Sequence, residues 1–276
     1  MNAGGPWPVA GPQPAVGPQP RRGGEESRLR TMLEVLARLA GLKADAVLRR
    51  RIARLPPAVV AAADPGAAAL ENPGWAAVLD GVTVQETRLF RHPAQLLAIG
   101  DWLGAAAMAS PMLLSAGCAT GEEAWSLAAL LLLLRRGEPA GRVCGIDICR
   151  PALALAEAAA YGPAPPDPLR DVPAVCRAMF PMEGGVVRPL APLRAMVGFR
   201  RASLLELPPE LPRLDLALCR NVLIYFTDAA REKVVTALVE RLRPGGLLGL
   251  GATDSPPPGL ALRPWGSPGL SLWEKR

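Results

Sequence analysis

The sequence has few aromatic residues, a single histidine and no closely paired cysteines. Only 4% of its 276 residues are aromatic although 50% are hydrophobic, so its core must be built mainly from leucine, valine and alanine. One histidine and five cysteines without a C-x-x-C pair exclude a credible metal site. We expect the cysteines to be reduced and mostly buried, as in a cytoplasmic protein. They are Cys118, Cys144, Cys149, Cys176 and Cys219.

The sequence also lacks a recognisable signal peptide and a membrane-spanning segment. Residues 1–20 do not contain a basic stretch followed by an apolar one. The longest apolar run, residues 124–134, is about eleven residues long, whereas ~20 are needed to cross a bilayer. The 31 basic and 25 acidic residues give a net charge of +6, which permits an acidic partner without requiring nucleic acid. We expect a soluble, cytoplasmic protein with no membrane insertion and no nucleic-acid partner.

The first part of the chain divides into three predicted regions. Residues 1–24 are rich in proline and glycine and have almost nothing to bury, so they are predicted to form a disordered tail. Apolar residues at helical spacing predict a small helical domain over residues 25–80. Residues 81–111 are predicted to hold a linker and one helix. Four arginines gather on the second predicted helix: Arg49, Arg50, Arg51 and Arg54.

From Met112 onward, predicted strands and helices alternate. Strands are predicted at 112–116, 142–148, 196–202, 214–219 and 247–252, helices at 122–136, 151–160 and 228–242, and two further strands near 260–263 and 271–274. This alternation predicts right-handed crossovers and a largely parallel, doubly wound α/β sheet. Gly184-Gly185 suggests a hairpin and hence a small β insertion within residues 177–195. An irregular proline-rich loop is the alternative there.

The loop after the first of these strands has the character of a ligand-binding turn. Gly117 and Gly121 bracket small residues, and Glu122 and Glu123 begin the next helix. A dinucleotide phosphate site would favour G-x-G-x-x-G without an acidic pair. The acids favour a ligand with cationic groups and hydroxyls, and S-adenosylmethionine (SAM) has both. The alternative is that the two acids only complement the helix dipole.

Two further strand ends carry polar residues. Asp147 ends the second strand, where doubly wound folds place an acid that hydrogen-bonds a ribose; it could instead cap the next helix. Arg220 and Asn221 follow the strand 214–219, and Tyr225 lies on the loop beyond. Packing alone would not select Arg-Asn at this position, although a simple ion pair of Arg220 with a nearby acid is the alternative. Together the three strand ends predict a cofactor crevice.

In four motifs the sequence resembles the CheR-type chemotaxis-receptor methyltransferases, which are protein-glutamate O-methyltransferases. The motifs are T-R-L-F-R at 87–91, S-A-G-C-A-T-G-E-E at 115–123, D-I at 147–148, and C-R-N-V-L-I-Y-F at 219–226 followed by L-R-P-G-G at 242–246. The resemblance implies a Rossmann-like class I SAM-dependent methyltransferase domain over residues 112–276 with a seven-stranded sheet. It also implies a small N-terminal all-α domain and a possible small β subdomain.

The resemblance further implies which residues form the site. Arg91 and Tyr225 would be catalytic, because they would orient the incoming carboxylate. The cofactor-binding positions would be Gln85, Thr87, Arg91, Gly117, Glu123, Asp147, Ser203, Leu204, Arg220 and Asn221. The chain departs from the family at several positions: Gln85 and Ser203 replace Asn, Leu89 replaces Phe, Trp125 replaces Tyr, and Gly251-Ala252-Thr253-Asp254 replaces G-H-S-E.

The implied activity is transfer of a methyl group from SAM to glutamate side chains of methyl-accepting chemotaxis-type receptors. A glutamate with a pKa of ~4.3 is already ionised at neutral pH and needs no general base, so we expect only a surface or supporting role for His92. The arginine cluster would meet acidic receptor helices, or else form a solvated helix face. A SAM-binding sensor or scaffold, and a methyltransferase with another protein or small-molecule substrate, are the alternatives. A monomer is expected.

Overall fold

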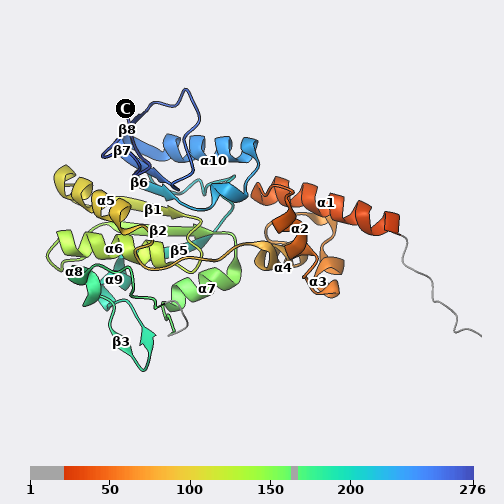
Figure 1. Ribbon diagram of the computed structural model, residues 1–276, viewed down its shortest axis with the longest axis horizontal. Helices are drawn as coiled ribbons and strands as arrows, with labels where there is room; N and C mark the ends of the chain where they lie inside the picture. The colour runs from red at the N-terminus through yellow and green to blue at the C-terminus, as the bar shows by residue number, and fades with distance from the viewer. Residues whose placement is uncertain (1–21, 163–166) are drawn as a thin grey trace, which may run out of the picture.

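The computed structural model describes residues 22–162 and 167–276, and it has two parts. Figure 1 shows a group of helices at one end and a larger α/β domain at the other. Residues 1–21 of the expected disordered tail lie outside the described residues. Residues 22–24, which were expected to belong to that tail, lie in the first helix, α1 (Arg22–Ala40).

The helical part is formed by α1, three further α-helices and a short 3-10 helix. These are α2 (Ala46–Ile52), α3 (Pro57–Ala62), η1 (Pro65–Ala67) and α4 (Pro73–Val82). Side chains that precede two of these helices cap their first turns. The Asp45 side chain accepts a hydrogen bond from the Leu48 amide of α2, and the Asn72 side chain accepts hydrogen bonds from the Gly74 and Trp75 amides of α4. Trp75 of α4 is fully buried, and its indole N–H donates to the Asp64 carbonyl at 2.7 Å.

The α/β domain is built on a seven-stranded sheet in the order β5-β2-β1-β6-β7-β9-β8. The first five of these in sheet order are parallel, and β9 pairs antiparallel with both β7 and β8. The predicted doubly wound, largely parallel sheet is therefore confirmed. The strands are β1 (Met112–Ala116), β2 (Arg142–Asp147), β5 (Val197–Arg201), β6 (Leu214–Cys219), β7 (Leu242–Leu250), β8 (Leu262–Pro264) and β9 (Leu272–Lys275).

Helices cover both faces of the sheet, as Figure 1 shows. Successive residues of β1 belong to the hydrophobic cores on the two faces. Leu114 packs in a core with α10 (Asp228–Arg241) and the helical part. Leu113 packs in a second core with α5 (Pro93–Ala106) and α6 (Glu122–Leu134). All six residues of β6 are buried, as expected of a central parallel strand. A further helix, α7 (Arg150–Ala158), contacts β5 at the sheet edge.

The suspected β insertion is a two-stranded hairpin with short helices on either side. β3 (Met182–Glu183) and β4 (Val186–Val187) pair antiparallel around Gly184 and Gly185, which both have positive φ. The flanking helices α8 (Ala174–Arg177) and α9 (Ala191–Met196) were not predicted. Tyr161 pairs with Val187 of the hairpin, and its hydroxyl donates to the Thr120 carbonyl at 2.8 Å. The hairpin is thus connected to the loop after β1.

The described residues contain no helix that is both long and apolar enough to span a membrane. All five cysteines are free, and only Cys144 is not fully buried. Burial raises the pKa of each of the five thiols above its ordinary value. These thiols are therefore poor nucleophiles, and their burial agrees with the prediction.

Candidate functional site

A large open cavity lies at the carboxyl ends of β1, β2 and β6, where the helical part meets the sheet. Its volume is about 1220 Å³ including the open mouth. Its walls come from three regions of the chain: the segment from the end of α1 through α2, the linker after α4, and the loops that follow the three strands.

Nearly every sequence-predicted site residue lines this cavity. The lining includes Thr87, Arg91, Gly117, Glu123, Asp147, Ser203, Leu204, Arg220, Asn221 and Tyr225. Gln85 is the exception. Its amide donates to the Asp80 carbonyl of α4 at 3.4 Å and to the Cys149 sulfur before α7, so its polar group is engaged in joining the helical part to the α/β domain.

The loop after β1 approaches the neighbouring loop so closely that only glycine fits at Gly117. Gly117 has φ +76°, and a Cβ built on it would lie 2.4 Å from Cγ2 of Val222. The backbone amides of Gly117 and Cys118 both donate to the Ile146 carbonyl, at 2.7 and 3.0 Å. The loop is therefore tightly folded against β2 and against the segment after β6.

Asp147 at the end of β2 is held by backbone donors. Its Oδ2 accepts from the Ala119 amide at 2.8 Å and its Oδ1 accepts from the Cys149 amide at 2.9 Å. Burial raises the pKa of this carboxyl, and the two backbone N–H groups oppose that shift. An ionised carboxylate has about four lone-pair sites, so both oxygens can still accept hydrogen bonds from ligand hydroxyls.

Glu123 and Arg220 form a buried ion pair across the floor of the cavity. Nε of Arg220 lies 3.2 Å from Oε2 of Glu123, and the two side chains are only 2% and 13% exposed. The other oxygen of Glu123 accepts from the Ser115 hydroxyl at 2.6 Å, and Arg220 also donates to the Arg91 carbonyl. Burial lowers the pKa of Arg220, and the negative charge of Glu123 opposes that shift.

Several polar atoms around this ion pair are buried without a hydrogen-bond partner. They are Nε of Arg91, Nη1 of Arg220 and Oδ1 of Asn221. Such atoms are costly unless a ligand satisfies them. Free guanidinium donors suit a carboxylate, and a free amide oxygen suits an ammonium group. The site therefore fits an amino-acid moiety near Arg220, and Asp147 fits a ribose, which are two parts of SAM.

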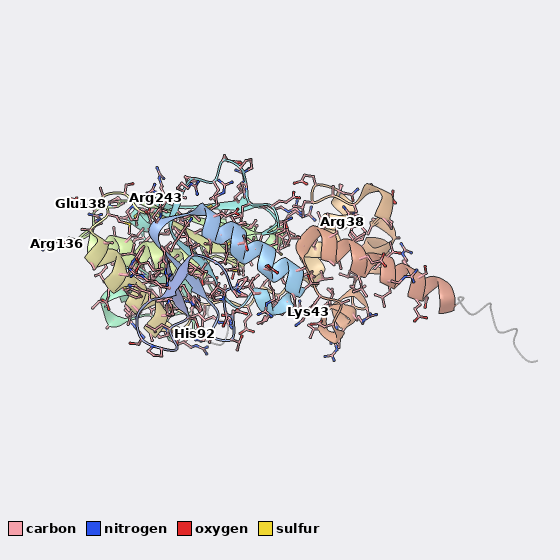
Figure 2. All side chains as sticks on the ribbon, turned by 90° about the horizontal axis from the view of Figure 1, so that it is seen from above. Arg38, Lys43, His92, Arg136, Glu138 and Arg243 are labelled. Atoms are coloured by element: carbon pink, nitrogen blue, oxygen red, sulfur yellow. The ribbon has the colours of Figure 1, made fainter. Side chains whose placement is uncertain are left out.

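The segment between α1 and α2 clamps the loop that carries Tyr225. The Lys43 amide donates to the Tyr225 carbonyl at 2.9 Å, the Thr227 amide donates to the Gly41 carbonyl at 2.8 Å, and Leu42 pairs with Phe226. Figure 2 shows Lys43 at the junction of the two parts of the molecule. This wall of the cavity was not predicted, because no local motif marks residues that pair over such sequence distances.

Ser203 also connects the two parts. Its buried hydroxyl donates to the Leu39 carbonyl at the end of α1, at 2.8 Å, and accepts from the Leu205 amide at 3.3 Å. The shorter serine, in the place where the related family has asparagine, thus engages its side chain in positioning α1.

The four arginines of the predicted cluster do not share one surface. Arg49, Arg50 and Arg54 are exposed on or just after α2. Arg51 is half-buried, lines the cavity and donates to the Thr83 carbonyl at 2.7 Å. It departs from the predicted basic face because the linker after α4 packs beside it.

His92 lies outside the large cavity. It is exposed, precedes α5 and lines a second hollow with Ala252 and Ser271. Partial burial lowers its pKa, and the nearby Arg220 and Arg91 add to that shift. His92 is therefore neutral at neutral pH.

Comparisons with known proteins agree with this geometry. The family model described as CheR methyltransferase, SAM binding domain, matches residues 85–259. Chemotaxis protein methyltransferase 1 of Vibrio cholerae is 30% identical over 191 residues, which cover 65% of this chain and 68% of that protein. Chemotaxis protein methyltransferase 2 of Pseudomonas aeruginosa is 32% identical over 148 residues, covering 51% of this chain and 52% of that protein.

Replacement of Gly117 should weaken ligand binding in the cavity without unfolding the domain. In Gly117→Ala, the new Cβ clashes with Val222 in a backbone conformation that costs about 1–2 kcal/mol for non-glycine residues. We expect the affinity for S-adenosylhomocysteine, measured by calorimetry, to fall at least about tenfold. Gly198→Ala in β5 is the matched control, because nothing lies within 4 Å of its Cβ. Unchanged binding by Gly117→Ala would contradict the proposed role of this loop.

Proposed function

Because this chain belongs to the CheR methyltransferase family, we propose that it transfers methyl groups from SAM to glutamate side chains of methyl-accepting chemotaxis-type receptors. The products are glutamate methyl esters and S-adenosylhomocysteine. Family membership confirms the predicted resemblance and SAM as the cofactor. The observation that best supports the cofactor end of the proposal is the pair of unpartnered buried atoms Nη1 of Arg220 and Oδ1 of Asn221.

The chemistry needs alignment more than proton transfer. When bound, SAM supplies a methyl carbon on a positively charged sulfur; a carboxylate oxygen bonds to this carbon, and the electron pair of the broken C–S bond stays on sulfur. The glutamate is ionised at neutral pH, with an ordinary pKa of ~4.3, so the protein does not have to remove a proton. Orientation of reacting groups can contribute about 7–11 kcal/mol in favourable cases.

Two groups of residues divide the work in this proposal. Asp147 and Glu123 hold the cofactor, with Asn221 offering its free amide oxygen. Arg91 and Tyr225 orient the incoming carboxylate. Both line the cavity; Arg91 is anchored by donation from its Nη1 to the Glu86 carbonyl at 2.9 Å, and the Tyr225 loop is anchored by Lys43.

The receptor would approach the side of the cavity formed by α2. The exposed Arg49, Arg50 and Arg54 give this side a positive charge, which attracts an acidic partner at a distance of up to about one Debye length, ~8 Å at physiological salt. A cytoplasmic location follows from the proposed substrate, which is the cytoplasmic domain of a receptor.

The experiment that tests the function is transfer of labelled methyl groups from SAM to receptor-rich membranes. We expect label in receptor bands that is lost on mild base treatment, because methyl esters hydrolyse in base whereas methylated nitrogen or carbon does not. Label that is stable to base would indicate another acceptor group. Binding of SAM without any label would favour a sensor.

Variants should separate cofactor binding from turnover. Tyr225→Phe and Arg91→Ala should lower kcat by about 10²-fold through misorientation of the carboxylate, with SAM affinity changed much less. Asp147→Ala should mainly weaken SAM binding, by roughly tenfold or more, because hydrogen bonds to the charged acceptor are lost. Steady-state kinetics together with calorimetric titration would measure both quantities. Full turnover by Tyr225→Phe would show that its hydroxyl has no catalytic role.

The exposed arginines of α2 should promote receptor binding through their charge alone. We expect Arg49→Gln with Arg50→Gln to raise KM for receptor about threefold or more at low salt, with the difference lost at high salt. Arg135→Gln with Arg136→Gln removes the same charge at the opposite end of the molecule, where Figure 2 places Arg136, and should leave KM unchanged. Equal effects of the two pairs would contradict a docking role for α2.

A further inference from the structure

We propose that Tyr161 is a positioning residue for the cofactor cavity: through its hydroxyl, the β3–β4 hairpin helps to hold the loop after β1 in the conformation that binds the cofactor. The inference rests on the proposed function, because it assigns this loop a role in holding SAM. The loop spans residues 117–121, and its first three residues line the cavity. Thr120 comes next, and its carbonyl accepts a hydrogen bond from the Tyr161 hydroxyl at 2.8 Å.

The loop needs support because one of its residues has a sparsely populated backbone conformation. Ala119 has φ +47°, which is uncommon for a residue with a side chain. Its amide donates to Oδ2 of Asp147 at 2.8 Å, so the conformation of Ala119 decides which lone pairs of this carboxylate stay available to a ribose. Such a conformation persists only where the surrounding contacts hold it.

Thr120, the residue after Ala119, is held on two sides. Its hydroxyl donates to Oε2 of Glu122 at 2.6 Å, and Glu122 is the buried first residue of α6. Its carbonyl accepts from Tyr161. Burial raises the pKa of Tyr161, so this hydroxyl stays protonated and able to donate at neutral pH. The two bonds fix Thr120 between α6 and Tyr161, and they restrict rotation of the neighbouring Ala119.

Tyr161 is itself fixed by the hairpin. It follows α7 closely, and α7 packs against the loop, since a Cβ built on Gly121 would lie 2.7 Å from Cβ of Ala156. The Tyr161 amide donates to the Val187 carbonyl of β4 at 3.0 Å, and the Val187 amide donates back to the Tyr161 carbonyl at 2.8 Å. The backbone of Tyr161 thus belongs to the hairpin, while its side chain holds the loop. By linkage, a ligand that orders the loop must also stabilise this backbone pairing.

The chain offers a matched control for the loss of a side-chain donor to a backbone carbonyl. Nζ of Lys275 in β9 donates to the carbonyls of Val239 and Leu242 at 2.7 and 2.8 Å. Leu242 begins β7, so these bonds lie at the amino ends of the parallel strands, whereas the cavity lies at their carboxyl ends. Lys275→Met removes this donor but keeps an unbranched side chain, and it therefore tests the effect of general destabilisation.

The first measurement is the affinity of the full chain for S-adenosylhomocysteine by calorimetry, which needs no methyl acceptor. Tyr161→Phe keeps the aromatic ring and the backbone pairing and removes only the hydroxyl. It should weaken binding about fivefold, the effect of losing one ordinary hydrogen bond. Lys275→Met should lower the melting temperature and leave the affinity unchanged.

The second measurement is hydrogen exchange of individual amides, with and without saturating S-adenosylhomocysteine. In the unaltered chain the ligand should slow exchange of the Tyr161 and Val187 amides more than that of the β8 and β9 amides, which report global stabilisation. β8 and β9 lie at one edge of the sheet, on the side of the molecule away from the hairpin (Figure 1). In Tyr161→Phe the additional protection of Val187 should disappear, although its backbone partner is retained.

Each result decides between distinct conclusions. Unchanged affinity in Tyr161→Phe, or an equal loss in Lys275→Met, would overturn the inference. So would equal protection of the hairpin and the β8 and β9 amides in the unaltered chain, or full protection of Val187 in Tyr161→Phe. The expected losses in a chain that transfers no methyl group would support the inference and overturn the proposed function alone. Failure of the unaltered chain to bind S-adenosylhomocysteine would overturn both.

Discussion

The buried ion pair between Glu123 and Arg220 is the interaction on which the rest of the site depends. It joins the first turn of α6 to the end of β6, and through Ser115 it also fixes the end of β1. Loss of one partner of such a pair typically costs 3–5 kcal/mol, roughly, because a charge is left buried and unpaired. The site is nevertheless incomplete, since Nη1 of Arg220 and Nε of the neighbouring Arg91 lack a hydrogen-bond partner. The structure therefore maintains, in a buried place, donors that only a ligand can satisfy.

The helical part completes this arrangement. Backbone pairing of Gly41–Lys43 with the Tyr225 loop, and the bond from Ser203 to Leu39, attach the end of α1 to the cavity. On the opposite side, the ion pair of Arg150 with Asp80, at 2.6 Å, attaches α4 to the start of α7. The helical part is thus a wall of the site, and any partner that contacts α2 also approaches the cavity mouth.

The local features of the chain and its parallel sheet were predictable from sequence, whereas individual long-range contacts were not. β6 was predicted at its observed residues because an unbroken apolar run between polar ends is typical of a central parallel strand. The glycine turn and the strand-end acid were found for the same reason, because each is fixed by its immediate neighbours. β7 begins five residues earlier than predicted, since its pairing with β6 passes through an irregularity that no periodicity reveals. The contacts of Gln85 and Arg51 were not predictable, because their hydrogen-bond partners, Cys149 and Thr83, are distant in sequence.

The parallel pairing of β1 with β6 has a consequence for the way this chain must fold. Leu113 and Leu216 lie opposite each other, yet about one hundred residues separate them, and contacts so distant in sequence slow folding because a long loop has to close first. During synthesis, β1 and the leucine-rich α6 emerge well before β6 can join the sheet. Until then their apolar surfaces lack their final neighbours, and the growing chain is most prone to aggregate at this stage. The cofactor cavity, whose floor requires β6, is among the last features of the molecule to form.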